Sequence, residues 1–197
     1  ATNHLNDAHL RLAGNLCSFG ALDGTGAFEW SSGILTNHLQ LGAGVSLDLT
    51  GSSPKTLHRF SSLSHDGPVT WSGSGALRMG QGSSWINRGV CQARNNGSVV
   101  TITGDAPTPV FENRGSFQRL DAPGILTFED GNGGVRFNNT GTVQVRTGVL
   151  ALRGGGENRQ GLFEVASGAQ LTFGTRAFSF EEGSHLEIEG LTQVDGA

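Results

Sequence analysis

The sequence predicts an all-β protein, a right-handed parallel β-helix (β-solenoid) with coils of about 20–27 residues. Three observations support this prediction: a 26-residue repeat, short segments with apolar residues at every other position, and an unusual composition. Glycine accounts for 32 of 197 residues, charged residues for 15%, and proline for only 5 residues. High glycine combined with alternating apolar residues is typical of many short strands joined by tight turns. No segment has a 3.6-residue periodicity, so a helical repeat is excluded.

The repeat is clearest in the second half of the chain. The segments WINRGVC (85–91), FENRGSF (111–117) and FNNTGTV (137–143) share an aromatic residue, an Asn two positions later and a Gly two positions after that. Equivalent positions recur at this constant period and are expected to stack as structural ladders: Asn87, Asn113, Asn139, Gly89, Gly115, Gly141, Trp85, Phe111 and Phe137. Phe163 lies one further period beyond Phe137 and is predicted to continue the aromatic ladder, although Val165 stands at the Asn position.

A second motif alternates with the first. It is a glycine followed by apolar residues at every other position, as in GSVVTITG (97–104) and GILTFEDG (124–131). Each repeat is therefore predicted to hold two short strands and to be too small to bury its own apolar face. Stacking the copies about 4.8 Å apart buries a continuous core. The Asn side chains would form an amide ladder at a turn, and the Gly two residues later would adopt a positive φ.

The whole chain, residues 1–197, is predicted to be a single solenoid domain. Residues 1–60 form less regular N-terminal coils, and residues 61–197 form the regular coils. Shorter steps between motifs near the C-terminus predict a narrower cross-section there. Neither end shows an amphipathic capping helix, and uncapped solenoid ends expose edge strands. We therefore expect either a fragment of a longer array or copies that associate end to end.

Charge and cysteine content exclude several classes of partner and site. The formal net charge is −4, and Lys55 is the only lysine, which argues against nucleic acid and anionic membranes as partners. No apolar stretch is long enough to predict a transmembrane segment. Two cysteines make neither a disulfide framework nor a zinc site. Cys91 falls at an apolar repeat position and is expected to be a buried free thiol, with a disulfide to Cys17 as the alternative.

These repeats resemble the arrays of large bacterial cell-surface and secreted proteins. The segments are WSGSGALRMGQGSSWINRGVC (71–91), FNNTGTVQVRTGVLALRGGG (137–156) and GLFEVASGAQLTFG (161–174). They are similar to the Phe-x-Asn-x-Gly-Thr-Val type repeats of autotransporter passengers and filamentous-haemagglutinin-type adhesins. The resemblance covers roughly residues 10–195. It implies an extracellular or cell-surface location and a structural or adhesive role, as a stalk or a head-to-tail fibre subunit.

Candidate surface residues give a second set of hypotheses. Glu112 and Glu164 recur loosely at the repeat spacing and predict an outer stripe, beside which Arg88 and Arg114 share a register position. A stripe of this kind is interpreted first as solvated surface, with a carbohydrate-binding module as the alternative. A polysaccharide-degrading β-helix enzyme ranks third, because it needs clustered carboxylates. We therefore predict no catalytic residue; the possible partners are further copies of the chain, glycans or other surface proteins.

Metal and cofactor sites are not predicted. His4 and His9, with Asp7 between them, have no recognisable ligand spacing, and the neighbouring His58, His65 and Asp66 are not interpreted as metal ligands. DGNGG (130–134) lacks the later acidic ligands of a calcium loop. Trp30, Trp71 and Trp85 open or align with strand motifs, so we expect them in the core rather than as sugar-stacking platforms.

Overall fold

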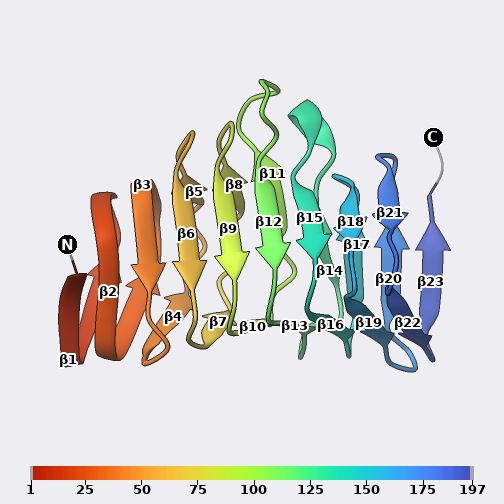
Figure 1. The fold of residues 1–197 in the computed structure, drawn as a ribbon, viewed down its shortest axis with the longest axis horizontal. Helices are drawn as coiled ribbons and strands as arrows, with labels where there is room; N and C mark the ends of the chain where they lie inside the picture. The colour runs from red at the N-terminus through yellow and green to blue at the C-terminus, as the bar shows by residue number, and fades with distance from the viewer. Residues whose placement is uncertain (1, 196–197) are drawn as a thin grey trace.

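The chain folds as a parallel β-solenoid of about nine coils. The computed structural model describes residues 2–195, except for the side chains of residues 18 and 19. Successive coils lie side by side along the long axis, with the N-terminal coil at one end and the C-terminal coil at the other (Figure 1). The predicted all-β solenoid is confirmed. Its only helical element is the 3-10 turn η1 (Gly131–Gly133) among the residues described.

The first coils are built from three long strands. These are β1 (Thr2–Leu12), β2 (Asn15–Trp30) and β3 (Gly33–Leu41). β2 pairs with β1 on one side, and with β3 and then β4 on the other, so it continues around a corner of the coil.

Every later coil contributes three short strands, not the two expected from the motifs. The strands form three parallel ladders, here called A, B and C. Ladder A starts with residues 33–35 of β3. It continues through β5 (Lys55–Leu57), β8 (Leu77–Met79), β11 (Ser98–Thr101), β14 (Ile125–Phe128), β17 (Val149–Leu152), β20 (Gln170–Phe173) and β23 (Leu191–Val194).

Ladders B and C follow the same order along the axis. Ladder B runs from residues 38–41 of β3 through β6 (Ser62–His65), β9 (Ser84–Asn87), β12 (Val110–Asn113), β15 (Arg136–Asn139), β18 (Gly156–Asn158) and β21 (Phe178–Phe180). Ladder C runs from residues 26–30 of β2 through β4 (Val45–Leu49), β7 (Val69–Trp71), β10 (Val90–Ala93), β13 (Ser116–Arg119), β16 (Thr142–Val145), β19 (Leu162–Val165) and β22 (His185–Ile188).

Coil length changes mainly in the turns from ladder A to ladder B. The turn between β11 and β12 spans residues 102–109, whereas that between β17 and β18 spans only 153–155 (Figure 1). Phe111 pairs with Phe137, one full repeat on, but Phe137 pairs with Gly156. The predicted place of Phe163 in the aromatic ladder is therefore wrong. Phe163 pairs with Val143 in ladder C, because the shortened turn breaks the constant spacing.

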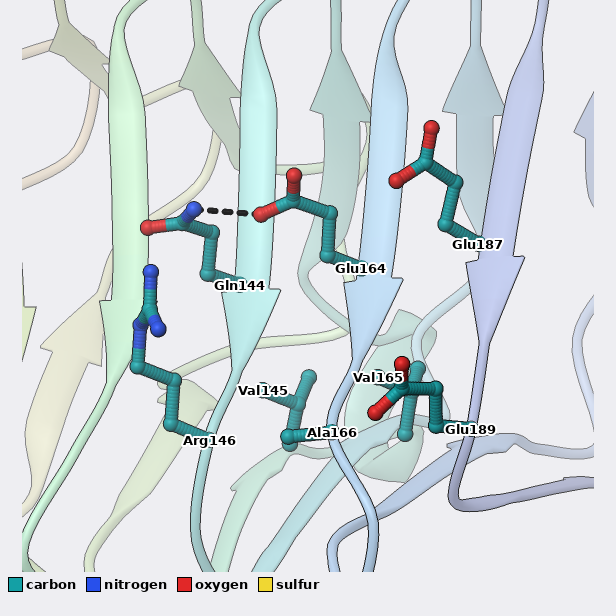
Figure 2. Close-up of a pocket in the computed structure, with 8 residues that line it drawn as sticks. All are labelled: Gln144, Val145, Arg146, Glu164, Val165, Ala166, Glu187 and Glu189. Atoms are coloured by element: carbon teal, nitrogen blue, oxygen red, sulfur yellow. Dashed lines mark hydrogen bonds between the residues drawn. The ribbon is translucent and has the colours of Figure 1, made fainter.

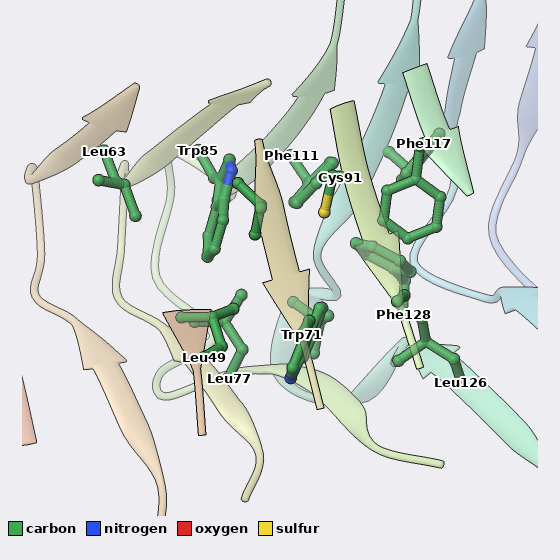
Figure 3. Close-up of a cluster of buried hydrophobic side chains, with 14 of the residues drawn as sticks. Leu49, Leu63, Trp71, Leu77, Trp85, Cys91, Phe111, Phe117, Leu126 and Phe128 are labelled. Atoms are coloured by element: carbon green, nitrogen blue, oxygen red, sulfur yellow. The ribbon is translucent and has the colours of Figure 1, made fainter. Parts of the chain in front are cut away.

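The core is one continuous apolar cluster inside the three ladders, and Figure 3 shows part of it. In ladder B the rings of Trp85, Phe111 and Phe137 stack, with centroids 5.5 and 5.4 Å apart. Trp30, Trp71 and Trp85 are fully buried, which confirms the core prediction. Cys91 is also fully buried, and burial raises the pKa of its thiol to about 12. Cys17 is exposed, and both thiols are free, as expected for Cys91.

The repeat glycines serve a different purpose from the one predicted. Gly89, Gly115 and Gly141 are not among the residues with positive φ. Instead, the coils approach so closely at this turn that a Cβ on Gly115 would clash with the carbonyl oxygen of Gly89, and one on Gly141 with that of Gly115. Glycine is therefore required by stacking rather than by backbone handedness.

Candidate functional site

The asparagines of the repeat form a buried amide ladder on the inner side of ladder B. Asn87 Nδ2 donates to Asn113 Oδ1, and Asn113 Nδ2 donates to Asn139 Oδ1, both at 2.7 Å. The same nitrogens donate to the carbonyl oxygens of Ser116 and Thr142, each at 3.0 Å. The ladder thereby ties each turn to the next coil and satisfies amides that would be costly to bury unpaired.

The ladder is longer than the sequence pattern indicated. Asn139 Nδ2 donates to Asn158 Oδ1 at 2.8 Å, and Asn158 Nδ2 donates to the carbonyl oxygen of Gly161 at 2.9 Å. Asn158 follows Asn139 by less than one full period, so a search at constant spacing missed it. The sequence signal that could have revealed Asn158 is an Asn followed closely by a Gly, here Gly161.

His65 occupies the position before Asn87 in the same column. Its Nδ1 lies 3.3 Å from the carbonyl oxygen of Gly67, and burial lowers its pKa to about 4. Its Nε2 and the Asn87 Oδ1 both lack a hydrogen-bond partner among the described residues. A neutral imidazole therefore ends the amide ladder on this side.

Two basic side chains, those of Lys55 and Arg119, also point into the core. Lys55 Nζ donates to the carbonyl oxygen of Ser53 at 3.3 Å, and burial lowers the pKa of this ammonium. Arg119 donates to Asn96 Oδ1 at 2.8 Å and to the carbonyl oxygen of Gly124 at 3.0 Å. The alternation of inward and outward positions predicts apolar residues at these two inward positions, so the sequence did not predict a buried lysine or arginine.

The predicted surface stripe does not exist as one stripe. Glu112 is followed on the outside of ladder B by Asn138 and then by Glu157, whereas Glu164 lies on ladder C. The expectation that Glu112 and Glu164 share a stripe is wrong for the same reason as the Phe163 prediction, namely the shortened coil. Glu112 Oε2 instead accepts a bond from Arg114 Nε at 2.9 Å.

The other predicted cations lie at the corner between ladders B and C. Arg88 pairs with Asp66 at 3.3 Å. Arg114 lies one coil further along this corner and lines an open groove of about 540 Å³ together with Asn138 and Thr140. Each guanidinium is thus engaged by a nearby carboxylate of the same chain.

The outside of ladder C carries a second amide ladder, which was not predicted. Gln92 Nε2 donates to Gln118 Oε1 at 3.2 Å, and Gln118 Nε2 donates to Gln144 Oε1 at 3.0 Å. Gln144 Nε2 then donates to Glu164 Oε2, and Glu187 is the next residue in the column (Figure 2). Period-2 alternation places these side chains on one face, but only the true register aligns them.

A hollow of about 290 Å³ lies at the acidic end of this column. Three carboxylates, those of Glu164, Glu187 and Glu189, line it together with Gln144 and Arg146 (Figure 2). Across residues 2–195, no group of three or more His, Cys, Asp or Glu side chains is arranged to hold a metal ion. The hollow is therefore an acidic patch suited to cationic side chains.

The opposite end of the same column is an arginine, followed by two acidic residues, Glu29 and Asp48. Arg11 on β1 lies in register with Glu29 on β2, and their side chains are 3.6 Å apart. His9 Nε2 lies 3.3 Å from the same carboxylate. A hydrogen bond from Thr50 and the charge of Arg11 lower the pKa of Glu29, although its partial burial opposes them. Following the register through ladder C, Arg11 and Glu187 stand at the two ends of one outward column.

The end coils expose residues that belong to inward columns. In the last coil the exposed apolar side chains of these inward columns are Phe180, Leu186, Ile188 and Val194. β22 pairs with β19 alone, and β1 with β2 alone, within the part of the chain described. Leu10 on β1 is 42% exposed and Leu186 on β22 is 41% exposed, and the two occupy the same inward column.

Comparison of the chain with protein-family models, curated proteins and solved structures gave no match. Among residues 2–195, no helix is long and apolar enough to cross a membrane.

Proposed function

We propose that this chain is a structural or adhesive element of a bacterial surface, not an enzyme, and that it extends as a rod by stacking end to end with further copies. One observation supports the proposal above the others. The strands at the two ends of ladder C carry complementary side chains: β1, which pairs with residues 26–30 of β2, and β22. Arg11 is flanked by Leu10 and Leu12 at one edge, and Glu187 is flanked by Leu186 and Ile188 at the other.

Parallel pairing of β22 with β1 of a second copy would continue the existing register. Leu186 would cover Leu10 of the second copy, and Ile188 would cover its Leu12. Glu187 would meet Arg11 of the second copy, which already contacts Glu29 of its own chain. The pairing would satisfy the free backbone groups of both edge strands and remove exposed apolar surface from water.

The distribution of charge supports the same head-to-tail orientation, with the last coil of one copy against the first strand of the next. Acidic side chains dominate residues 176–195 of the last coil, where Arg176 and His185 are outnumbered by Glu181, Glu182, Glu187, Glu189 and Asp195. The first strand carries Arg11 with His4 and His9 against Asp7. Opposite charges steer association and fix the register, and salt screens them. A head-to-tail contact that does not close into a ring gives an open filament.

The test is the assembly state of the purified chain. Light scattering after size exclusion, with negative-stain electron microscopy, should show rods that lengthen with protein concentration and shorten at high salt. Glu187→Arg should weaken association by about tenfold, the equivalent of about 1.4 kcal/mol. Combining Glu187→Arg with Arg11→Glu should recover much of the loss, because the pair is then reversed.

Glu182→Arg is the matched control. It changes the same charge in the same coil but lies outside the Arg11 column, so it should weaken association less than Glu187→Arg. Short rods at every concentration, or equal effects of the two substitutions, would contradict the proposal.

A further inference from the structure

A cleft of about 320 Å³ opens where ladder A turns into ladder B, in the coils of β3, β5, β8 and β11. Two columns form its walls. Ile34, Thr56 and Arg78 are consecutive outward residues of ladder A. His58 and Ile102 stand at equivalent positions of the turn, one coil before and one coil after Gly80.

Gly80 makes the hollow. It lies between the exposed side chains of His58 and Ile102 and presents no side chain of its own. A Cβ at this position would lie 2.5 Å from the backbone nitrogen of Arg59, so the close stacking of the coils requires glycine. The stacking of the coils thus holds the cleft open.

The polar lining is rich in guanidinium groups. Arg59 Nη2 donates to Gln81 Oε1 at 2.9 Å, and its guanidinium carbon lies 5.6 Å from the centre of the Phe60 ring. These two contacts orient Arg59. Neither Arg59 nor Arg78 forms an ion pair with a carboxylate of the described residues, and Asp105 is the one acid lining the cleft.

The rest of the lining is apolar or hydroxylated. Ile34 and Ile102 offer apolar surface, with Ile102 43% exposed, while Thr56 and Thr103 carry hydroxyl groups. Guanidinium groups bind carboxylates with paired hydrogen bonds, and hydroxyl and amide groups suit the hydroxyls of a sugar. The volume is near the lower limit of small-molecule sites, which run from about 300 to 1,000 Å³.

We propose that this cleft binds a carboxylated sugar residue. Its carboxylate would lie against Arg59 and Arg78, one face of its ring against Ile34 and Ile102, and its hydroxyls against Gln81 and the threonines. None of the residues that line the cleft belongs to β1 or β22, so this site does not depend on end-to-end stacking.

Isothermal titration calorimetry at low salt tests the site with a galacturonic acid trisaccharide, and a galactose trisaccharide as the neutral comparison. The acidic trisaccharide should bind with a Kd of about 1 mM or below, and the neutral one at least about tenfold more weakly. Arg59→Gln and Arg78→Gln should each weaken binding by about tenfold. Arg136→Gln, which removes an exposed arginine from ladder B, should leave binding unchanged.

Both cleft arginines are exposed, so the variants should keep the melting temperature of the parent chain, and a loss of binding then reports on the site. Equal binding of the two trisaccharides would overturn the proposal, as would unchanged binding by the double variant. Competition by acetate as effective as by the trisaccharide would show a simple anion site and overturn the sugar assignment. Absence of heat at about 10 mM acidic trisaccharide would also overturn it.

Discussion

The central coils and the last coil share one architecture but differ in what covers their inward side chains. Phe111 and Asn113 on β12 lie between β9 and β15 and are fully buried. Phe180 on β21 occupies the same column as Asn113 but is 42% exposed. A solenoid coil therefore obtains its core from neighbours along the axis rather than from its own three strands.

The same comparison explains which residues can occupy an inward column. Asparagine is tolerated where an amide above and an amide below complete its hydrogen bonds, as for Asn113. At the ends of the column the residue changes: His65 precedes the amides and Phe180 follows them. The two amides at the ends of the ladder have only one amide neighbour each: Asn158 donates instead to the carbonyl oxygen of Gly161, whereas Asn87 Oδ1 has no partner among the described residues.

The largest expected difference between the two regions concerns their phenylalanines. Phe111→Ala should lower the free energy of unfolding by about 3–5 kcal/mol, because it removes a ring that stacks on both Trp85 and Phe137. Phe180→Ala should cost about 1 kcal/mol or less, because the side chain is already half in solvent. Urea denaturation followed by circular dichroism measures both, and equal losses would show that the last coil is covered in solution.

The amide ladder gives the next largest effect. Asn113→Ala should cost about 3 kcal/mol, because it leaves Asn139 Oδ1 and the Thr142 carbonyl oxygen without the Asn113 donor. Asn138→Ala is the matched control on the neighbouring strand. Its side chain points outward and its Oδ1 has no hydrogen-bond partner among the described residues, so less than about 1 kcal/mol should be lost. An equally large loss for Asn138→Ala would show that outward-facing amides stabilise the coils as much as the inward-facing ladder does.

His65 should make the ladder sensitive to acid. Its pKa is about 4 when folded, against 6.5 when unfolded, because burial disfavours the imidazolium, and the Gly67 carbonyl and Asp66 offset this only in part. Between these pH values the unfolded chain takes up a proton that the folded chain does not, so stability falls as pH drops from about 6.5 to 4 and this contribution is constant below. The total is about 3 kcal/mol at most.

His65→Asn should abolish this part of the pH dependence. The new amide can also donate to Asn87 Oδ1, which has no partner among the described residues, so stability at pH 5 should rise. Unfolding free energies measured at several pH values decide the matter: a variant with the same slope as the parent would place the titrating group elsewhere.

The sequence pattern predicts correctly what repeats at constant spacing and fails where the spacing changes. Asn87, Asn113 and Asn139 were aligned correctly because the coils between them are equal in length. Asn158 was missed and Phe163 was misplaced because the turn at residues 153–155 shortens the next coil. Turn length is free to vary, since only the strands must stay in register.

The inward charges and the third strand of each coil were missed for a different reason. Lys55 and Arg119 break the alternation of apolar and polar residues, and backbone carbonyls of nearby turns satisfy them in part. Those carbonyls are brought close only by the fold. The first motif was interpreted as one strand, although WINRGVC (85–91) spans parts of two, β9 and β10, which are separated only by Arg88 and Gly89.

The smallest expected loss of stability concerns the outer amide ladder, compared with the inner one. Gln118 donates to Gln144 and accepts from Gln92, as Asn113 does with its own neighbours, but on the outside of ladder C. Gln118→Ala should cost only about 0.5 kcal/mol, because water can replace both bonds at a half-exposed site. Gln118→Glu should cost more than Gln118→Ala, since a carboxylate oxygen would then face the acceptor Oε1 of Gln144 with no hydrogen between them. Thermal denaturation of the two variants beside Asn113→Ala tests whether burial, and not the number of amide bonds, sets the value of each ladder; equal losses for Gln118→Ala and Asn113→Ala would refute that dependence on burial.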